Sequence, residues 1–195
     1  MCSSDLETPY IKLITQLFGE RMIISNATGC SSIYGGTAPF TPYRPNIDGQ
    51  GPAWANSLFQ DNAEYGYGIA VGITQLRKRM AERMRSAIKE NKMGSETLET
   101  MKAWIDGMYN AEVSKEVTAR LLPLLEKETD TIAAELLSLR HYMINKSIWI
   151  IGGDGWAYDI GYGGLDHVIA SGEDVNILVL DTEVYSNTGG QCSKS

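Results

Sequence analysis

The sequence SIWIIGGDGWAYDIGYGG, residues 147–164, decides the fold of this chain. Its first five residues form a run typical of a buried strand, and a Gly-Asp-Gly turn follows at residues 153–155. We expect a crossover helix over residues 157–171 and a second buried strand, VNILVL, over residues 175–180. A strand, a helix and a strand in this order predict a parallel pair within an α/β domain.

Both predicted strands end in loops that carry polar chemistry. Asp154 lies between two glycines after the first strand. The second strand is followed by the loop DTEVYSNTGGQ, residues 181–191. Ligands of open parallel sheets bind at the carboxyl ends of the strands. The sequence therefore predicts a site formed by residues 152–156 together with residues 181–191.

Two classes of ligand suit such a site. A dinucleotide requires G-x-G-x-x-G after the first strand, but Tyr158 stands where the third glycine belongs. Asp181, at the end of the second strand, would suit a ribose, so a nucleotide or S-adenosylmethionine remains an alternative. The other class is a diphosphate held through Mg²⁺, an ion that prefers oxygen ligands. Four groups offer such oxygens: the carboxylate of Asp154, the hydroxyl of Thr182, the amide of Asn187 and the backbone carbonyl around Val184.

The composition limits the class of protein. The 195 residues are 43% hydrophobic and 21% charged, which is typical of a globular domain with a core of its own. The formal charge of -7 argues against nucleic acid as a general partner. The apolar runs are far shorter than the roughly 20 residues that cross a bilayer, so we expect no membrane span. Three scattered cysteines and the lack of a signal-peptide pattern predict a cytoplasmic location.

The rest of the chain is predicted to be mainly helical. We expect a helix over residues 7–19, a short strand over 22–24, a long loop over 26–52 and a helix over 53–92. Further helices are expected over residues 95–109, 114–127 and 129–145, with a perturbation at Pro123. The basic residues of the long helix are predicted to form its solvated face: Arg77, Lys78, Arg79, Arg83, Arg85, Lys89 and Lys92.

Four separated strings resemble those of pyruvate:ferredoxin (flavodoxin) oxidoreductases. They are NATGCSSIYGG (26–36), GPAWANSLFQDNAEYGYG (51–68), GDGWAYDIGYGGLDH (153–167) and DTEVYSNTGGQ (181–191). The resemblance implies an α/β fold, a parallel-sheet thiamine-diphosphate-binding domain with a transketolase-like pyrophosphate module. Residues 1–195 would form this single, partial domain, with a helical insertion over about 69–147 and a truncated C-terminus. The chain would then be a fragment of a longer enzyme.

The resemblance also assigns residues to cofactors. It implies Mg²⁺ ligation by Asp154, Thr182 and the Val184 carbonyl. Thiamine diphosphate would contact Glu7, Cys30, Gly153, Asp154, Gly155, Trp156, Thr182, Glu183, Val184, Tyr185, Ser186 and Asn187. Cys2 and Cys30 would ligate a [4Fe-4S] cluster, although Asp5 stands where the family has another cysteine. Cys192 departs from the family pattern and is interpreted as a spare buried thiol.

Members of the family decarboxylate pyruvate oxidatively to acetyl-CoA and pass electrons through iron-sulfur clusters to ferredoxin or flavodoxin. The implied partners are the remaining domains of the enzyme, pyruvate, coenzyme A, the electron acceptor and a second subunit of a homodimer. The substrate pocket and the carboxylate that activates the cofactor are expected on other domains. A catalytically inactive fragment or binding module that retains the fold is therefore the alternative to an active enzyme.

Overall fold

The computed structural model describes residues 4–37 and 39–195, with side chains from residue 7 onward. The chain divides into two compact units. The first, here called the sheet unit, comprises Met1–Val71 and Ser147–Ser195, and the second, the helical unit, comprises Gly72–Lys146. The interpretation of the helical segment as an insertion within one cofactor domain stays a prediction. Among the described residues, no helix is both long and apolar enough to cross a membrane.

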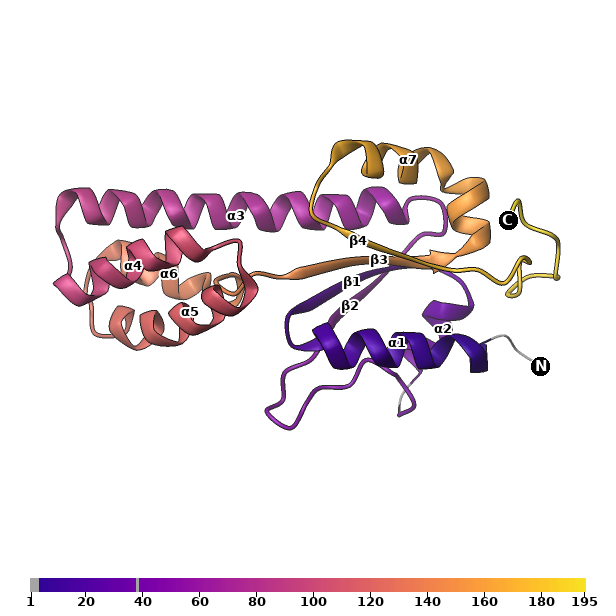
Figure 1. The fold of residues 1–195 in the computed structure, drawn as a ribbon, viewed down its shortest axis with the longest axis horizontal. Coiled ribbons are helices and arrows are strands. Elements are labelled where there is room, and N and C mark those ends of the chain that lie inside the picture. Colours follow the sequence, from indigo (N-terminus) through magenta and orange to yellow (C-terminus); the bar gives the residue numbers. More distant parts are fainter. Residues whose placement is uncertain (1–3, 38) are drawn as a thin grey trace. The chain divides into compact units, whose positions relative to one another are not determined.

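The sheet unit contains four parallel strands in the order β2-β1-β3-β4 (Figure 1). The strands are β1 (Met22–Ala27), β2 (Ala53–Ser57), β3 (Ser147–Gly153) and β4 (Asn176–Leu180). Because all four run in one direction, their carboxyl ends meet at one edge of the sheet. The predicted α/β class with a parallel pair is confirmed.

Helices cover both faces of this sheet (Figure 1). One face packs against α1 (Ser4–Phe18), which continues as the short helix η1 (Gly19–Arg21), and carries α2 (Cys30–Gly36) nearby. The other face packs against α7 (Tyr162–Ser171) and the first turns of α3 (Asn62–Glu90). Ile150 and Ile151 of β3 enter the two different cores, as expected when successive strand residues alternate between faces.

Asn62 joins three strands at the carboxyl edge. Its Nδ2 donates to the Ile151 carbonyl at 3.0 Å. Its Oδ1 accepts hydrogen bonds from Ser25 Oγ at 2.6 Å and from Ser57 Oγ at 2.8 Å. All of these side chains are buried, so the network satisfies polar groups that would otherwise destabilise the sheet.

The helical unit has a hydrophobic core of its own. It contains the remainder of α3 with α4 (Ser95–Gly107), α5 (Ala111–Leu125), α6 (Thr131–Ser138) and η2 (Arg140–Tyr142). Asn110 and Asp130 cap α5 and α6, since each side chain accepts a hydrogen bond from a backbone N–H of the first turn. Its largest fully buried side chains include Met80, Met84, Met101, Trp104, Leu121 and Leu125.

Several predicted boundaries were wrong. Residues 53–57, predicted as the start of a helix, form β2, because pairing with β1 overrides the weak strand propensity of AWANS. Residues 30–36, within the predicted loop, form α2. Pro123 lies inside α5, and α6 ends at Ser138, well before the predicted residue 145.

The largest correction concerns Arg77, which was predicted on a solvated face but is 3% exposed. Arg77 lies three residues before Met80 and therefore on the same buried stripe of α3. Its guanidinium donates to the carbonyls of Tyr142, Met143 and Met108 and lies 5.2 Å from the centroid of Trp104. Burial lowers the pKa of Arg77 to about 10.

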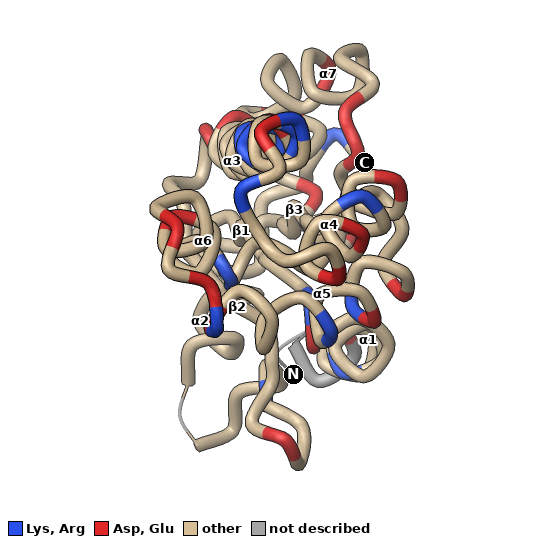
Figure 2. The backbone as a smooth tube through the Cα atoms, turned by 90° about the vertical axis from the view of Figure 1, so that its left-hand side faces the viewer, with Lys and Arg blue, Asp and Glu red and all other residues tan. Residues whose placement is uncertain are grey.

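The other basic residues of the predicted face are at least partly accessible to solvent. Figure 2, in which α3 is seen nearly end-on, shows blue Lys and Arg positions and red acidic positions on its turns. Arg79 and Arg83 form ion pairs with Glu135 at 2.6 and 2.7 Å. The prediction of a solvated basic face is therefore confirmed for Lys78, Arg79, Arg83, Arg85, Lys89 and Lys92 and wrong for Arg77.

Candidate functional site

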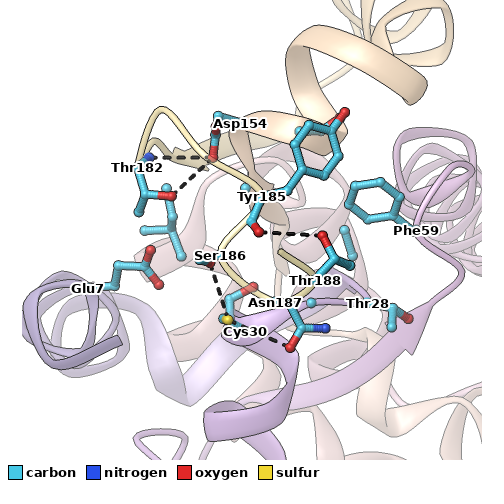
Figure 3. Close-up of a pocket in the computed structure, with 16 residues that line it drawn as sticks. Glu7, Thr28, Cys30, Phe59, Asp154, Thr182, Tyr185, Ser186, Asn187 and Thr188 are labelled. Carbon is cyan, nitrogen blue, oxygen red and sulfur yellow. Dashed lines mark hydrogen bonds between the residues drawn. The ribbon is translucent and has the colours of Figure 1, made fainter. Parts of the chain in front are cut away.

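A cavity of about 280 Å³ lies at the carboxyl edge of the sheet (Figure 3). Its walls come from α1, from the loops that follow β1, β2 and β4, and from the turn that follows β3. Most of the predicted cofactor contacts line it: Glu7, Cys30, Gly153, Asp154, Gly155, Thr182, Tyr185, Ser186 and Asn187. Of the other three, Glu183 and Val184 belong to the adjoining loop and Trp156 is fully buried in the core.

Two of the predicted magnesium ligands, Asp154 and Thr182, line one corner of this cavity, and the third, the Val184 carbonyl, lies next to the Thr182 hydroxyl. Asp154 is 2% exposed, and its Oδ1 lies 3.4 Å from both the backbone N and the Oγ1 of Thr182. Thr182 Oγ1 also lies 3.1 Å from the Val184 carbonyl oxygen. A hydroxyl has one hydrogen, so it cannot donate to both acceptors at once. We call Asp154, Thr182 and Val184 the acidic corner.

The acidic corner leaves one buried oxygen without a partner. Asp154 Oδ2 is buried and has no hydrogen-bond partner among the described residues. A buried carboxylate oxygen in that state is expensive unless a cation or an ordered water satisfies it. A carboxylate, a hydroxyl and a carbonyl are the hard oxygen ligands that Mg²⁺ prefers, so the donors fit that ion.

A cluster of several acidic or thiol ligands is not found in the part of the chain that the structure describes. No group of three or more His, Cys, Asp and Glu side chains there could hold a metal ion. Any ion at the acidic corner would therefore rely on one carboxylate and on neutral oxygens. A diphosphate could supply further oxygens, as substrate phosphates commonly do for Mg²⁺.

The glycines of the turn serve different purposes. A Cβ on Gly152 would lie 2.5 Å from the Trp156 ring, and one on Gly155 would lie 2.8 Å from the Tyr185 ring. Both positions therefore need glycine for packing within the protein. At Gly153 the nearest atom to such a Cβ is a carbonyl oxygen 3.7 Å away. Of the three glycines, Gly153 alone combines a place in the cavity wall with ordinary space around its Cα.

A second acid enters the cavity from α1. Glu7 is 9% exposed and lines the wall, and Tyr34 Oη donates to its Oε2 at 3.3 Å. Burial raises the pKa of Glu7, and the charge of Asp154 raises it further, while the Tyr34 hydrogen bond acts in the opposite direction. Burial and the nearby Glu7 also raise the pKa of Tyr34.

Cys30 lies on another side of the cavity, where it contacts the loop after β4. Ser186 Oγ donates to its Sγ at 3.3 Å, and the Cys30 thiol donates to Asn187 Oδ1 at 3.7 Å (Figure 3). The Asn187 oxygen, considered as a possible magnesium ligand, thus faces Cys30. Cys2 and the side chain of Asp5 lie outside the described residues.

Cys192 was predicted to be a spare buried thiol, and this was wrong. The residue is exposed, and its backbone pairs with that of Val184. A short antiparallel bridge of this kind holds the backbone without covering the side chain.

Sequence reasoning missed several residues that line the cavity, among them Thr28, Gly29, Ser31 and Phe59, and a contact that Asp159 makes beside it. Phe59 lines the cavity, but the segment before it was predicted to be helical, so its position after a strand was not apparent. Asp159 falls within the crossover helix predicted over residues 157–171, and no role was predicted for it, whereas its Oδ2 accepts a hydrogen bond from Tyr185 Oη at 2.8 Å. Burial of the phenol, together with this hydrogen bond, raises the pKa of Tyr185 to about 12.

Comparison with known proteins identifies relatives of the chain. No family model matches it. It is 53% identical to a pyruvate:ferredoxin oxidoreductase of Moorella thermoacetica and 55% identical to a pyruvate-flavodoxin oxidoreductase of Klebsiella pneumoniae. Each match covers 100% of this chain and 17% of the relative. A protein of Euglena gracilis named "Pyruvate dehydrogenase [NADP(+)], mitochondrial" is 52% identical over 100% of the chain and 11% of its own length.

The chain therefore spans about a sixth of the length of the first two relatives. The family resemblance that the four sequence strings predict is confirmed, and the similarity extends through the helical unit as well. Over its whole length, this chain is homologous to one segment of the pyruvate:ferredoxin and pyruvate-flavodoxin oxidoreductases.

Proposed function

We propose that this chain is the thiamine-diphosphate- and Mg²⁺-binding part of an enzyme that decarboxylates pyruvate oxidatively to acetyl-CoA. The observation that carries the proposal is the acidic corner, where a buried carboxylate oxygen of Asp154 has no partner among the described residues. The named activities of the relatives supply the reaction class. Thiamine diphosphate, when bound, supplies the electron sink for decarboxylation.

The chain's own residues would bind and orient the cofactor. Asp154, the Thr182 hydroxyl and the Val184 carbonyl would hold the ion that neutralises the diphosphate. Glu7 and Tyr34 would border the same cavity with a hydrogen-bonded carboxyl group. The cavity is large enough for part of a cofactor at about 280 Å³, which agrees with a site completed by other parts of a longer enzyme.

The nucleotide alternative has less support, because it rests on Asp181 alone. Each carboxylate oxygen of that residue already accepts one hydrogen bond within the chain. Oδ1 accepts from the Glu183 backbone N–H at 3.0 Å, and Oδ2 accepts from Ser195 Oγ at 2.7 Å. These hydrogen bonds lower the pKa of Asp181 and leave it as a cap for the loop.

The wider parts of the proposal rest on the family resemblance, and the relatives' names supply the electron acceptors, ferredoxin and flavodoxin. Electrons would pass through iron-sulfur clusters to ferredoxin or flavodoxin, with coenzyme A as the acetyl acceptor and a homodimer as the assembly. A cytoplasmic location is included, although one relative is named mitochondrial. The 195-residue chain by itself is expected to release no CO₂ from pyruvate, because a carboxylate that activates the cofactor is expected elsewhere in the enzyme.

Calorimetric titration of the 195-residue chain with thiamine diphosphate, with and without Mg²⁺, tests the proposal. We expect binding that requires Mg²⁺ and that Asp154→Ala removes. Asp166→Ala, which deletes an exposed carboxylate of α7, is the matched control and should bind like the wild type. Equal binding by wild type and Asp154→Ala, or binding of NAD or S-adenosylmethionine instead, would contradict the proposal.

The iron-sulfur part has a separate test. A [4Fe-4S] cluster is normally held by four thiolates, but this chain has three cysteines. One of them, Cys192, is exposed in the segment after β4. We expect no stable cluster after anaerobic reconstitution with iron and sulfide. Retention of four irons per chain after desalting would overturn this expectation, and Asp5→Cys should then improve retention.

A further inference from the structure

Tyr185 connects the loop after β4 to the turn after β3. Its Oη donates to Asp159 Oδ2 at 2.8 Å and lies 3.5 Å from the Gly155 carbonyl oxygen. Asp159 and Gly155 both belong to the short helix η3 (Gly155–Ile160). The Tyr185 ring occupies the space that a Cβ on Gly155 would need. On its other side the ring lies 6.2 Å from that of Phe59.

The backbone of the same residue organises the loop. The Tyr185 N–H donates to the Gln191 carbonyl at 2.8 Å, and the Tyr185 carbonyl accepts from the Gly190 N–H at 3.0 Å. The neighbouring Val184 pairs with Cys192 in an antiparallel bridge. Tyr185 therefore attaches the loop to η3 through its side chain and stabilises the fold of the loop through its backbone.

The segment that Tyr185 holds includes a strained position. Glu183 has a φ of 61°, in the left-handed region that residues other than glycine rarely adopt. It lies between Thr182 and Val184, the two residues that give the acidic corner its hydroxyl and carbonyl. Such a conformation persists only where the surrounding structure enforces it.

We propose that Tyr185 is a positioning residue. Through Asp159 and Gly155 it fixes the loop so that the Thr182 hydroxyl lies against Asp154 and the Val184 carbonyl lies next to that hydroxyl. Tyr185 itself would not bind the ion. The identity of the ion rests on the proposed function, whereas the holding of the loop does not.

The first arm of the test uses the chain without cofactors. Amide hydrogen exchange of residues 182–191 is measured in Tyr185→Phe, in Asp159→Ala and in the double variant. We expect each single variant to raise exchange about fivefold to tenfold, as for one lost hydrogen bond. The double variant should exceed Asp159→Ala by little, because Tyr185→Phe removes a hydrogen bond that Asp159→Ala has already removed. Asp159→Ala also removes the ion pair of Asp159 Oδ1 with Lys194 Nζ at 3.5 Å, so Lys194→Gln is measured beside it. Tyr162→Phe and Asp166→Ala, at exposed positions of α7, are the matched controls.

The second arm measures Mg²⁺ affinity at saturating thiamine diphosphate. We expect the dissociation constant for Mg²⁺ to rise about fivefold to tenfold in Tyr185→Phe and Asp159→Ala. Asp159→Asn keeps an oxygen acceptor for the phenol and should restore most of the affinity. Urea denaturation accompanies each variant, because a purely structural role would lower stability without changing the Mg²⁺ constant of the folded chain.

The outcomes separate the two proposals. Unchanged exchange in both single variants would overturn the holding of the loop. Raised exchange with an unchanged Mg²⁺ constant would overturn the positioning of the ligands. Lack of any Mg²⁺-dependent binding by the wild type would overturn the proposed function, and with it the role toward the ion, while the exchange result still decides whether Tyr185 holds the loop.

Discussion

Arg77 in the helical unit and Asp154 in the sheet unit are both almost completely buried, at 3% and 2% exposure. Arg77 donates to three backbone carbonyls and lies against the Trp104 ring, so that Nε is its one nitrogen without a hydrogen-bond partner among the described residues. Asp154 has two long contacts, both to Thr182, and an oxygen without a partner on the wall of a cavity.

The difference teaches how to distinguish two kinds of buried charge. A charge enclosed by acceptors inside a core belongs to the fold, because its removal strands those acceptors. A buried charged group that has an atom without a hydrogen-bond partner beside a cavity destabilises the fold and indicates a ligand site. The predictions below test this distinction, beginning with the largest expected effect.

Arg77→Met should lower the free energy of unfolding by about 3 kcal/mol, because it leaves the carbonyls of Tyr142, Met143 and Met108 without their donor. Urea denaturation measures the loss, and Mg²⁺-dependent binding of thiamine diphosphate should not change. Arg85→Met, at an exposed position of the same helix, is the control. A loss no larger than that of the control would break the comparison.

Asp154→Asn should act in the opposite direction on stability. Without cofactors, the free energy of unfolding should rise by about 1 kcal/mol, because a neutral amide replaces a buried carboxylate with an unsatisfied oxygen. The same variant should lose Mg²⁺-dependent binding. Asp166→Asn, which changes an exposed carboxylate, should alter neither property. A less stable Asp154→Asn would show that the carboxylate belongs to the fold after all.

The two described residues other than glycine with positive φ sharpen the comparison further. Asn91, with a φ of 50°, follows the end of α3, where asparagine commonly adopts this conformation. Glu183 lies in the acidic corner's own loop. Glu183→Gly should raise the free energy of unfolding by about 0.5 kcal/mol, whereas Asn91→Gly should leave it nearly unchanged. Thermal and urea denaturation decide, and an equal gain at both positions would remove the distinction.

The smallest effect concerns pH and Glu7. Burial raises the pKa of Glu7 above its ordinary value of 4.5, so the folded chain binds this proton more tightly than the unfolded chain. The associated stability is fully present below pH 4.5 and is lost as the pH rises through the folded pKa. Glu7→Gln should therefore gain stability relative to the wild type as the pH rises from 4 to 8. Glu173→Gln, at an exposed position, should show no such trend.

The sequence was sufficient to predict the β3–α7–β4 unit and the edge of the sheet where the polar loops meet. The reason is that an uninterrupted apolar strand and its flanking glycines depend little on distant contacts. Asp154, Thr182 and Val184 could be expected together because the carboxyl ends of neighbouring parallel strands adjoin. The structure agrees with that arrangement, while the binding of cofactors there stays a prediction.

The rest depends on tertiary contacts. AWANS becomes a strand because β1 is available to pair with it, and Arg77 is buried because three carbonyls converge on its position. The Tyr185–Asp159 hydrogen bond joins residues 26 positions apart, and no local pattern marks it. Positions that break a local rule, such as a left-handed glutamate, become intelligible only beside their neighbours.

The order of strands in the sheet also has a consequence for folding during synthesis. The Ile151 carbonyl on β3 accepts hydrogen bonds from the side-chain amides of Asn26 and Asn62. These residues precede it in the sequence by 125 and 89 positions. The helical unit lies between these partners in the sequence and is built from neighbouring helices, so we expect it to fold while β1, although able to pair with β2, still lacks β3 on its other edge. That edge of β1 then stays exposed until β3 leaves the ribosome. The chain's greatest risk of aggregation falls in that interval.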